Sequence, residues 1–216
     1  MKYFKKIEGS RIYLSPMNID DLEIYTKWLN DCNVTNGIHG THKMINLETE
    51  KEYLNKCLSN GEYQFAIVKK ENDELIGNCG IDDISFRDQN GVIGLFIGEE
   101  ENRNKGYGKE AIDLLLEYCF NYLNLNNIML KVFSFNERAI KCYKKVGFKE
   151  IGRRRKCCYL NGKFYDDVYM DILKEEYFKW YYLKKLYTNK IINWYIIFYF
   201  DWTKNKSFFE YFRYQL

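Results

Sequence analysis

Two glycines beside basic residues follow an apolar run at the point where a helical pattern begins. The segment reads Ile97-Gly-Glu-Glu-Glu-Asn-Arg-Asn-Lys-Gly-Tyr-Gly-Lys-Glu. Glycine allows a ligand to approach the main chain closely, and the free N–H groups of a first helical turn attract anions. Arg103 and Lys105 add positive charge, which suits a pyrophosphate better than a lone carboxylate. The segment therefore predicts a phosphate-binding turn, although Gly-x-Gly alone is more typical of an ordinary strand-to-helix turn.

Two common phosphate-binding loops fit this segment poorly. A Walker loop needs glycine where Arg103 stands and Ser or Thr where Glu110 stands. Gly106-Tyr-Gly-Lys-Glu-Ala matches the pattern of a dinucleotide loop. Such a loop normally follows the first strand of a parallel sheet, and an acidic residue stands after the next strand. Here antiparallel strands are predicted before the turn, and Val132-Phe-Ser-Phe carries no acid. An NAD-binding enzyme is therefore a less favoured alternative.

The turn and a second block resemble the GNAT acetyltransferase superfamily. Arg103-Asn-Lys-Gly-Tyr-Gly is similar to its pyrophosphate loop, Arg/Gln-x-x-Gly-x-Gly/Ala, and Asn136-Glu-Arg-Ala-Ile-Lys-Cys-Tyr-Lys-Lys-Val-Gly-Phe is similar to Asn-x-x-Ala-x-x-x-Tyr-x-x-x-Gly-Phe. The resemblance extends from Arg11 to Leu173 and is closest to the branch of ribosomal-protein and polyamine acetyltransferases. It implies an N-acetyltransferase that moves an acetyl group from acetyl-CoA, its co-substrate, to a primary amine by direct attack in a ternary complex, with no metal.

The resemblance also implies roles for individual residues. The main chain around Phe96 and Ile97 would pair with the pantetheine amides, and Asn136 would face the pantetheine arm. Tyr143 would donate a proton to the departing thiolate; independently of the family, a phenol of pKa about 10 can protonate a thiolate of pKa about 8.5. The pyrophosphate would be held by the turn itself, which consists of Arg103, Asn104, Lys105, Gly106, Tyr107, Gly108 and Lys109.

The general base is less clearly marked, because Val92 stands where many GNAT relatives carry a glutamate. Glu99 is the candidate base near the turn. Asp82 and Asp83 are candidates for binding a cationic acceptor, but alternation along a strand allows at most one of them to reach it. Four acceptor classes stay open: a protein N-terminal amine, a polyamine, an amino sugar and an aminoglycoside-like compound. Because Val92 lacks a carboxylate, a catalytically inactive CoA-binding sensor or interaction protein is the alternative function.

A mixed sheet with flanking helices is needed to position these residues. Asn18 and Asn46 are predicted to cap two amphipathic helices, and a longer helix, with Tyr122 on its apolar face, is predicted from Gly108 to Leu123. Asn161-Gly162 marks a hairpin. The sequence thus predicts an α/β (α+β), mostly antiparallel sheet of six to seven strands with about four helices; the GNAT resemblance adds splayed central parallel strands. The predicted strands are 11–17, 64–68, 75–84, 92–97, 128–132, 149–159 and 164–173.

Composition narrows the location and partners. Lys and Arg number 33 and Asp and Glu 30, so the net charge is +3, and the intermixed signs give no indication of nucleic acid binding. Seven cysteines without a C-x-x-C pair and an N-terminus without a secretory signal predict a cytoplasmic protein. Residues 1–174 are predicted to form the catalytic domain. Residues 175–216 form an aromatic-rich extension that predicts an added helix or a self-association surface, including a homodimer, rather than membrane attachment.

Overall fold

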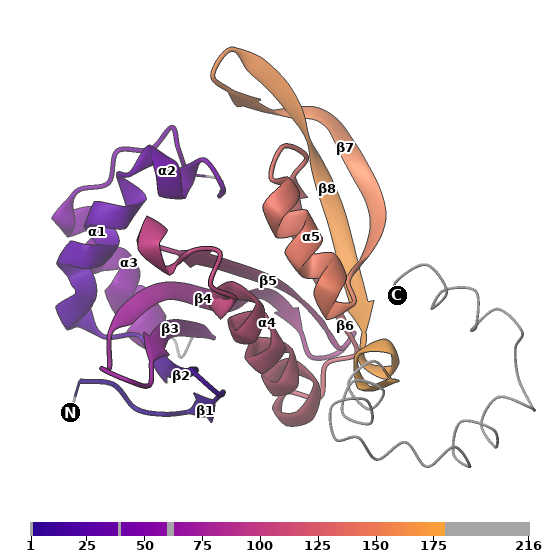
Figure 1. Ribbon diagram of the computed structural model, residues 1–216, viewed down its shortest axis with the longest axis horizontal. Coiled ribbons are helices and arrows are strands. Elements are labelled where there is room, and N and C mark those ends of the chain that lie inside the picture. The colour runs from indigo at the N-terminus through magenta and orange to yellow at the C-terminus, as the bar shows by residue number, and fades with distance from the viewer. Residues whose placement is uncertain (1, 39, 60–62, 180–216) are drawn as a thin grey trace, which may run out of the picture. The chain divides into compact units, whose positions relative to one another are not determined.

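The computed structural model describes residues 2–38, 40–59 and 63–179 (Figure 1). Within these ranges eight strands form one sheet in the order β1-β2-β3-β4-β5-β6-β8-β7. The predicted mixed α/β architecture is confirmed; the strand beyond the predicted six to seven is the two-residue β1, which is too short to give a periodic signal. The strands are β1 (Ile7–Glu8), β2 (Ile12–Pro16), β3 (Gln64–Lys69), β4 (Leu75–Ser85), β5 (Asn90–Ile97), β6 (Asn127–Phe133), β7 (Lys149–Leu160) and β8 (Lys163–Leu173).

The helices begin where the capping residues predict. Asn18 Oδ1 accepts a hydrogen bond from Asp20 N at 2.9 Å, and Asn46 Oδ1 accepts one from Thr49 N at 2.8 Å. The short helix α2 was not predicted. The elements in the described ranges are η1 (Ile19–Asp21), α1 (Leu22–Leu29), α2 (Cys32–Thr35), α3 (Leu47–Ser59), η2 (Glu100–Asn102), α4 (Tyr107–Glu117), η3 (Tyr118–Tyr122) and α5 (Glu137–Val146).

The helix predicted from Gly108 to Leu123 changes character at its end. It runs as α4 to Glu117 and then widens into the π-helical turn η3, in which Leu123 N donates to Tyr118 O at 3.1 Å. A π-turn inserts a residue relative to the 3.6-residue repeat. Tyr122 is therefore 69% exposed, and its predicted place on the apolar face is wrong.

The strand connections follow the predicted topology. β3, β4 and β5 form an antiparallel meander, and β5 pairs with β6 in parallel after the crossover through α4. The final strands form a hairpin in which Asn161 and Gly162 have φ values of 48° and 79°, as a type I′ turn requires. β8 lies between β6 and β7, so β7 is an edge strand.

The parallel strands β5 and β6 diverge, as predicted. They pair only at Asn90 with Asn127, Gly91 with Ile128 and Val92 with Met129, although β5 continues to Ile97 and β6 to Phe133. Figure 1 shows α1 and α3 with β2–β4 on one side of this divergence and α5 with the β7–β8 hairpin on the other. The sheet thus parts at its centre, next to the turn that precedes α4.

An aromatic cluster fixes the end of β5 against α1. Trp28 is 1% exposed, and its ring meets those of Tyr25 and Phe96 edge-on, with centroid distances of 5.8 and 6.0 Å. A Cβ atom at Gly98 would lie 2.0 Å from Trp28 Cε2, so only glycine fits against the indole. This packing determines where the chain leaves β5 and enters the glycine-containing turn.

The predicted extension at 175–216 lies outside the described residues after position 179, so the boundary at 174 stays a prediction. All seven cysteines are free thiols. Within the described ranges, we find no helix with the length and apolar character needed to cross a bilayer. No cluster of three or more His, Cys, Asp or Glu side chains suited to a metal ion occurs there either.

Candidate functional site

The glycine-containing turn presents main-chain N–H groups at the start of α4. Asn104 and Gly106 have φ values of 61° and 85°, so the chain turns twice through the left-handed region. The first hydrogen bond of α4 is donated by Glu110 N to Gly106 O at 3.1 Å. The N–H groups between these two residues therefore have no acceptor within the helix, and together with the helix dipole they form the anion-binding geometry predicted from the sequence.

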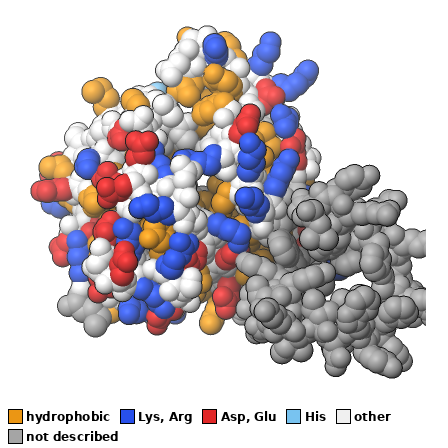
Figure 2. All heavy atoms as spheres, in the orientation of Figure 1, with side chains coloured by type: hydrophobic (Ala, Val, Ile, Leu, Met, Phe, Trp, Pro, Cys, Tyr) orange, Lys and Arg blue, Asp and Glu red, His pale blue; other side chains and the backbone are white. Residues whose placement is uncertain are grey.

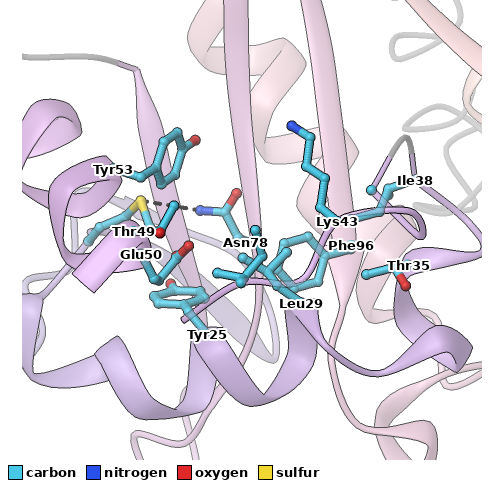
Figure 3. Close-up of a pocket in the computed structure, with 13 residues that line it drawn as sticks. Tyr25, Leu29, Thr35, Ile38, Lys43, Thr49, Glu50, Tyr53, Asn78 and Phe96 are labelled. Carbon is cyan, nitrogen blue, oxygen red and sulfur yellow. Dashed lines mark hydrogen bonds between the residues drawn. The ribbon is translucent and has the colours of Figure 1, made fainter. Parts of the chain in front are cut away.

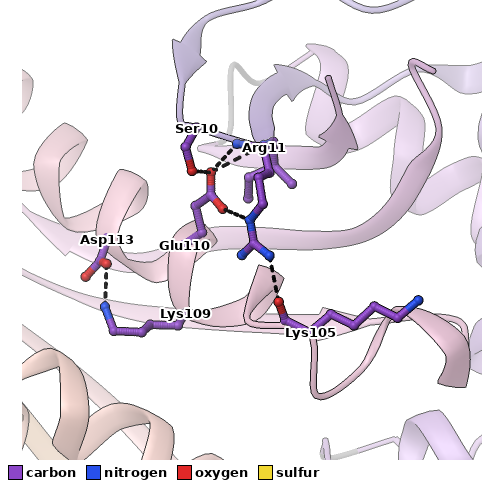
Figure 4. Close-up of polar contacts among 7 residues, drawn as sticks. Ser10, Arg11, Lys105, Lys109, Glu110 and Asp113 are labelled. Carbon is purple, nitrogen blue, oxygen red and sulfur yellow. Dashed lines mark hydrogen bonds and ion pairs between the residues drawn. The ribbon is translucent and has the colours of Figure 1, made fainter. Parts of the chain in front are cut away.

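Arg11 and Glu110 connect the start of β2 to this turn (Figure 4). The Glu110 carboxylate accepts hydrogen bonds from Ser10 Oγ at 2.9 Å, Arg11 N at 2.7 Å and Arg11 Nε at 3.0 Å. Burial alone would raise the pKa of Glu110, but these hydrogen bonds lower it. Arg11 also donates from Nη1 to Lys105 O at 2.8 Å and lies 4.7 Å from the ring centre of Tyr107. Arg11 thus holds the turn in place.

Arg103 is bound to main-chain carbonyls. Its guanidinium donates to Ile97 O at 3.2 Å, to Gly98 O at 2.6 Å and to Asn33 O at 3.0 Å. These bonds hold the turn against the end of β5. They also join the turn to Asn33, the second residue of α2. The geometry therefore favours a positioning role for Arg103 over the predicted direct contact with a phosphate.

One edge of β5 faces the divergence without a strand partner among the described residues. Gly98 N donates to Ile76 O at 2.9 Å, and in the same register Phe96 is paired with Asn78. Because main-chain groups alternate in direction along a strand, the N–H and C=O of Phe96 point toward β4, and those of Leu95 and Ile97 point into the gap. The register leaves the main-chain groups of Leu95 and the N–H of Ile97 free of β4, and the predicted pantetheine contact at Phe96 and Ile97 stays a prediction.

Tyr143 and Asn136 lie on α5, which follows β6. Burial raises the pKa of the half-buried Tyr143, and the neighbouring Cys142 adds to the increase. The ring contacts Phe148 edge-on at a centroid distance of 5.9 Å. Asn136 Oδ1 caps α5 by accepting from Ala139 N at 3.2 Å. The predicted contacts of both residues with the acyl carrier stay predictions, and Tyr143 is in the protonated state that a proton donor needs.

Glu99 is held by α1. Its Oε1 accepts hydrogen bonds from Lys27 Nζ at 2.7 Å and from Trp28 Nε1 at 2.9 Å. These two bonds lower the pKa of Glu99, which weakens it as a base. The arrangement favours a structural role for Glu99, joining the end of β5 to α1, over the predicted catalytic one.

Asp82 and Asp83 are separated by a bulge. Asp82 pairs with Val92 across the sheet and accepts from Gln64 Nε2 at 2.9 Å, whereas Asp83 lies in the register irregularity with φ of 48°. Cross-strand partners point to the same face, so Asp82 shares a face with Val92 and Phe96. Asp82 is the member of the pair placed to meet an acceptor on that face.

A cavity of about 360 Å³ opens on this face, between α1, α3 and the strands β4 and β5 (Figure 3). Glu50 from α3 borders it and is only 4% exposed. Burial raises the pKa of its carboxyl to about 7. The cavity is also lined by Tyr25, Lys43, Tyr53, Asn78 and Phe96. The cavity is therefore a mostly apolar site with a single acid in its wall.

Comparison with known proteins identifies the fold. Residues 14–169 match the family described as an acetyltransferase (GNAT) domain. The chain belongs to the GNAT acetyltransferase family. This GNAT protein is 29% identical over 170 residues to the uncharacterized N-acetyltransferase p20 of Bacillus licheniformis, which covers 77% of the chain and 95% of that relative. It is 30% identical over 130 residues to the spermidine N(1)-acetyltransferase of Vibrio cholerae, covering 60% of the chain and 74% of the relative.

A solved structure shares the fold of this chain. The GNAT fold of the chain superposes with a TM-score of 0.72 on the spermidine N-acetyltransferase of Vibrio cholerae solved with CoA and spermine. That structure is 24% identical and covers 79% of this chain and 99% of its own. The chain is an acetyl-CoA-dependent N-acetyltransferase of the GNAT family, and the NAD-binding alternative falls with that result.

Two residues of this GNAT site were missed from the sequence. Arg11 contacts a residue 99 positions away, and no local pattern reports such a pair. Glu50 did carry a signal: it lies four positions before Leu54, on the side of α3 that carries the buried Leu54 and Cys57. A charged residue at such a position indicates either that this side of the helix is exposed or that the acid is buried for a functional reason.

Proposed function

We propose that this enzyme binds acetyl-CoA and a small-molecule primary amine together and transfers the acetyl group directly to the amine nitrogen. One observation carries the proposal: β5 and β6 separate after Val92 and Met129, and β5 then leads into the turn whose N–H groups precede α4. This arrangement provides a strand edge with free main-chain groups that leads to an anion site, which suits a long polar arm attached to a diphosphate.

The residues around this strand edge fit such a carrier. The main-chain groups of Leu95 and the N–H of Ile97 can pair with the carrier's amides, as an added strand would; the Ile97 carbonyl already accepts a hydrogen bond from Arg103. A Cβ atom at Gly108 would come no closer than 3.7 Å to Leu95 Cδ1, so the space beside this part of the turn is open and a ligand can approach the main chain there. Figure 2 shows Lys and Arg side chains over α5, and this charge favours an anionic carrier. The basic residues of α5 are Arg138, Lys141, Lys144 and Lys145.

The chemistry divides between the co-substrate and the protein. Acetyl-CoA supplies a thioester, whose acetyl group passes to the amine while its sulfur leaves as a thiol. We assign to Tyr143 Oη the proton that the departing sulfur takes up; the protons that the amine nitrogen loses pass to water, and water returns one proton to Tyr143 Oη. Because burial raises the pKa of Tyr143, the phenol carries that proton at neutral pH. Binding both reactants side by side supplies much of the rate advantage.

The acceptor is proposed to be a small alkylamine of the polyamine kind. The relative from Vibrio cholerae is by name a spermidine acetyltransferase, and this supports a polyamine over a protein N-terminus, an amino sugar or an aminoglycoside-like compound. A polyamine is cationic at pH 7, and its binding site needs a carboxylate. Asp82 lies on the correct face to contribute one.

Location and assembly are part of the same proposal. The free cysteines fit a reducing cytoplasm. The aromatic-rich segment 175–216 would join two copies into a homodimer. Light scattering on the full chain, read as molar mass over a range of concentrations, tests this assembly, and a monomer at all concentrations would count against it.

Initial rates test the reaction. Thiol release is measured while acetyl-CoA and spermidine are varied, together with one representative of each other amine class. A ternary complex predicts double-reciprocal lines that intersect, whereas parallel lines would indicate an acetylated enzyme intermediate and contradict direct transfer. Tight binding of CoA without thiol release from any amine would favour the non-catalytic CoA-binding alternative.

A further inference from the structure

The cavity beside β5 contains a buried acid that the fold does not use. Glu50 is 4% exposed and borders the cavity. Among the described residues, none donates a hydrogen bond to its carboxyl or forms an ion pair with it. A buried carboxyl without a partner is costly, and a leucine at this position would pack against α1 at no such cost. A ligand that binds in the cavity therefore explains why an acid is buried at this position.

A second polar group in the same wall is also unused. The hydroxyl of Tyr25 is buried and has no hydrogen bond of normal geometry in the described part of the chain, and the Asn78 amide is its polar neighbour. Tyr25 comes from α1 and Glu50 from α3, and both side chains line the cavity in Figure 3. Two helices thus direct one carboxyl and one hydroxyl into a site that is otherwise largely apolar and aromatic.

The cavity lies on the side of the sheet where an acceptor has to arrive. The Phe96 side chain lines it, while the main chain of the neighbouring residues Leu95 and Ile97 faces the side of β5 assigned to acetyl-CoA. A ligand in the cavity is therefore separated from the acyl carrier by β5 alone and reaches the divergence of β5 and β6 from the opposite side.

We propose that this cavity is the acceptor site and that the Glu50 carboxylate binds the ammonium group of an alkylamine, with the Tyr25 hydroxyl as an added hydrogen-bond acceptor. The proposal rests on the acetyl transfer proposed above and specifies its substrate. The aromatic walls accommodate the methylene chain, and cations bind well against tyrosine and phenylalanine faces.

Few of the described residues around Glu50 are charged or titratable. Tyr25 lies on α1 and Tyr53 on α3, and burial raises the pKa of both phenols, so neither carries charge near neutral pH. The charges of Asp82 and Glu50 also contribute to the shift of Tyr53, which places both acids near its ring. Lys43 borders the cavity, and Figure 3 shows its side chain extending away from Glu50. Glu50 is the acid placed to meet a cation deep in the site.

Calorimetry with CoA-saturated enzyme tests the proposal directly. Spermidine and hexylamine are titrated into the wild type, into Glu50→Gln and into Glu52→Gln, an exposed acid on the same helix that serves as the control. We expect Glu50→Gln to weaken both amines at least tenfold and Glu52→Gln to leave them unchanged. Because the free Glu50 carboxyl is partly protonated near pH 7, wild-type binding should release a fraction of a proton, which buffers of different ionisation enthalpy reveal. That release should vanish in Glu50→Gln.

Kinetics separate this inference from the proposed reaction. In Glu50→Gln the KM for the amine should rise at least tenfold, while the KM for acetyl-CoA stays within twofold of the wild-type value. If the wild type acetylates no amine, the proposed reaction fails. If the wild type acetylates spermidine and both Glu50→Gln and Glu50→Leu retain its amine affinity and proton release, the assignment of Glu50 is wrong. Melting temperatures verify that each variant is folded.

Discussion

Arg11 Nε lies 3.0 Å from Glu110 Oε2, and this ion pair joins the start of β2 to the first turn of α4. The same guanidinium reaches Lys105 O at 2.8 Å, immediately before Gly106. A residue distant in the sequence therefore sets the shape of the turn assigned to the pyrophosphate, without needing to touch it. In the same way Arg103 ties the turn to the end of β5.

Arg11→Ala should loosen this turn. Removing the side chain deletes the bonds to Glu110 and Lys105, which are partly exposed, so the free energy of unfolding should fall by only about 1 kcal/mol. The KM for acetyl-CoA should rise about tenfold, equivalent to about 1.4 kcal/mol, with a smaller effect on the KM for the amine. Arg87→Ala, at a side chain that is 94% exposed, is the control. If Arg11→Ala and Arg87→Ala changed the KM for acetyl-CoA equally, the role of Arg11 would be contradicted.

Gly108→Ala and Gly108→Leu together separate ligand binding from stability. The added Cβ would meet Leu95 Cδ1 at an ordinary 3.7 Å, and alanine is the better helix former. The alanine variant should therefore be as stable as the wild type, or up to about 1 kcal/mol more stable. We expect the KM for acetyl-CoA to stay within about twofold of the wild-type value in Gly108→Ala, because the family's loop accepts Gly or Ala at this position, and to rise at least about tenfold in Gly108→Leu, because the larger side chain occupies the approach to the main chain. Gly152→Ala, where a Cβ meets nothing within 4 Å, should change neither quantity.

Tyr143→Phe tests the proton donor. The substitution keeps the ring contact with Phe148 and removes the hydroxyl, so kcat should fall about 100-fold with the KM for acetyl-CoA nearly unchanged. Because burial raises the pKa of Tyr143, wild-type kcat should show no loss from this group as the pH rises from 7 to 9. Tyr122→Phe, at an exposed ring, is the control. An unchanged kcat in Tyr143→Phe would remove the assignment.

Local signals were sufficient for most of the fold. Asn18, Asn46 and Gly147 mark helix ends, and Asn161-Gly162 marks the last hairpin, because capping and turn geometry depend on neighbouring residues only. The π-turn at Tyr118 was missed because the apolar repeat before it continues in the sequence without a break. β1 has two residues and no period to detect.

The sequence predicts the parts of the site that lie in one continuous segment. It does not predict the parts that depend on which distant residues pair with one another. The turn from Arg103 to Lys109 is one segment, so its type and spacing were sufficient to predict it. Whether the main-chain groups of Phe96 or those of Leu95 are free depends on which residues bond to β4, a matter of register that no motif encodes. Glu99 was a plausible base until its contacts with Lys27 and Trp28 were known, and these come from a helix 71 and more positions away.

Glu50 also makes a prediction about stability. Burial raises the pKa of its carboxyl from the ordinary 4.5 to about 7, so the folded protein binds a proton more tightly than the unfolded chain. The contribution of this group to the free energy of unfolding is therefore fully present below pH about 4.5 and is lost as the pH rises through about 7. The loss above pH 7 is on the order of 3 kcal/mol, at 1.36 kcal/mol per pKa unit.

Glu50→Gln should remove this loss, because glutamine has no charge to bury. Measured by urea unfolding, its stability relative to the wild type should be higher at pH 8 than at pH 4.5, while its affinity for spermidine is lower. A residue that costs stability and supports binding belongs to the ligand site and not to the packing. Adding spermidine to the wild type at pH 8 should recover stability, because the ammonium then compensates the carboxylate. If the stability difference between the variant and the wild type is the same at pH 4.5 and pH 8, Glu50 is paired within the protein and the acceptor site lies elsewhere.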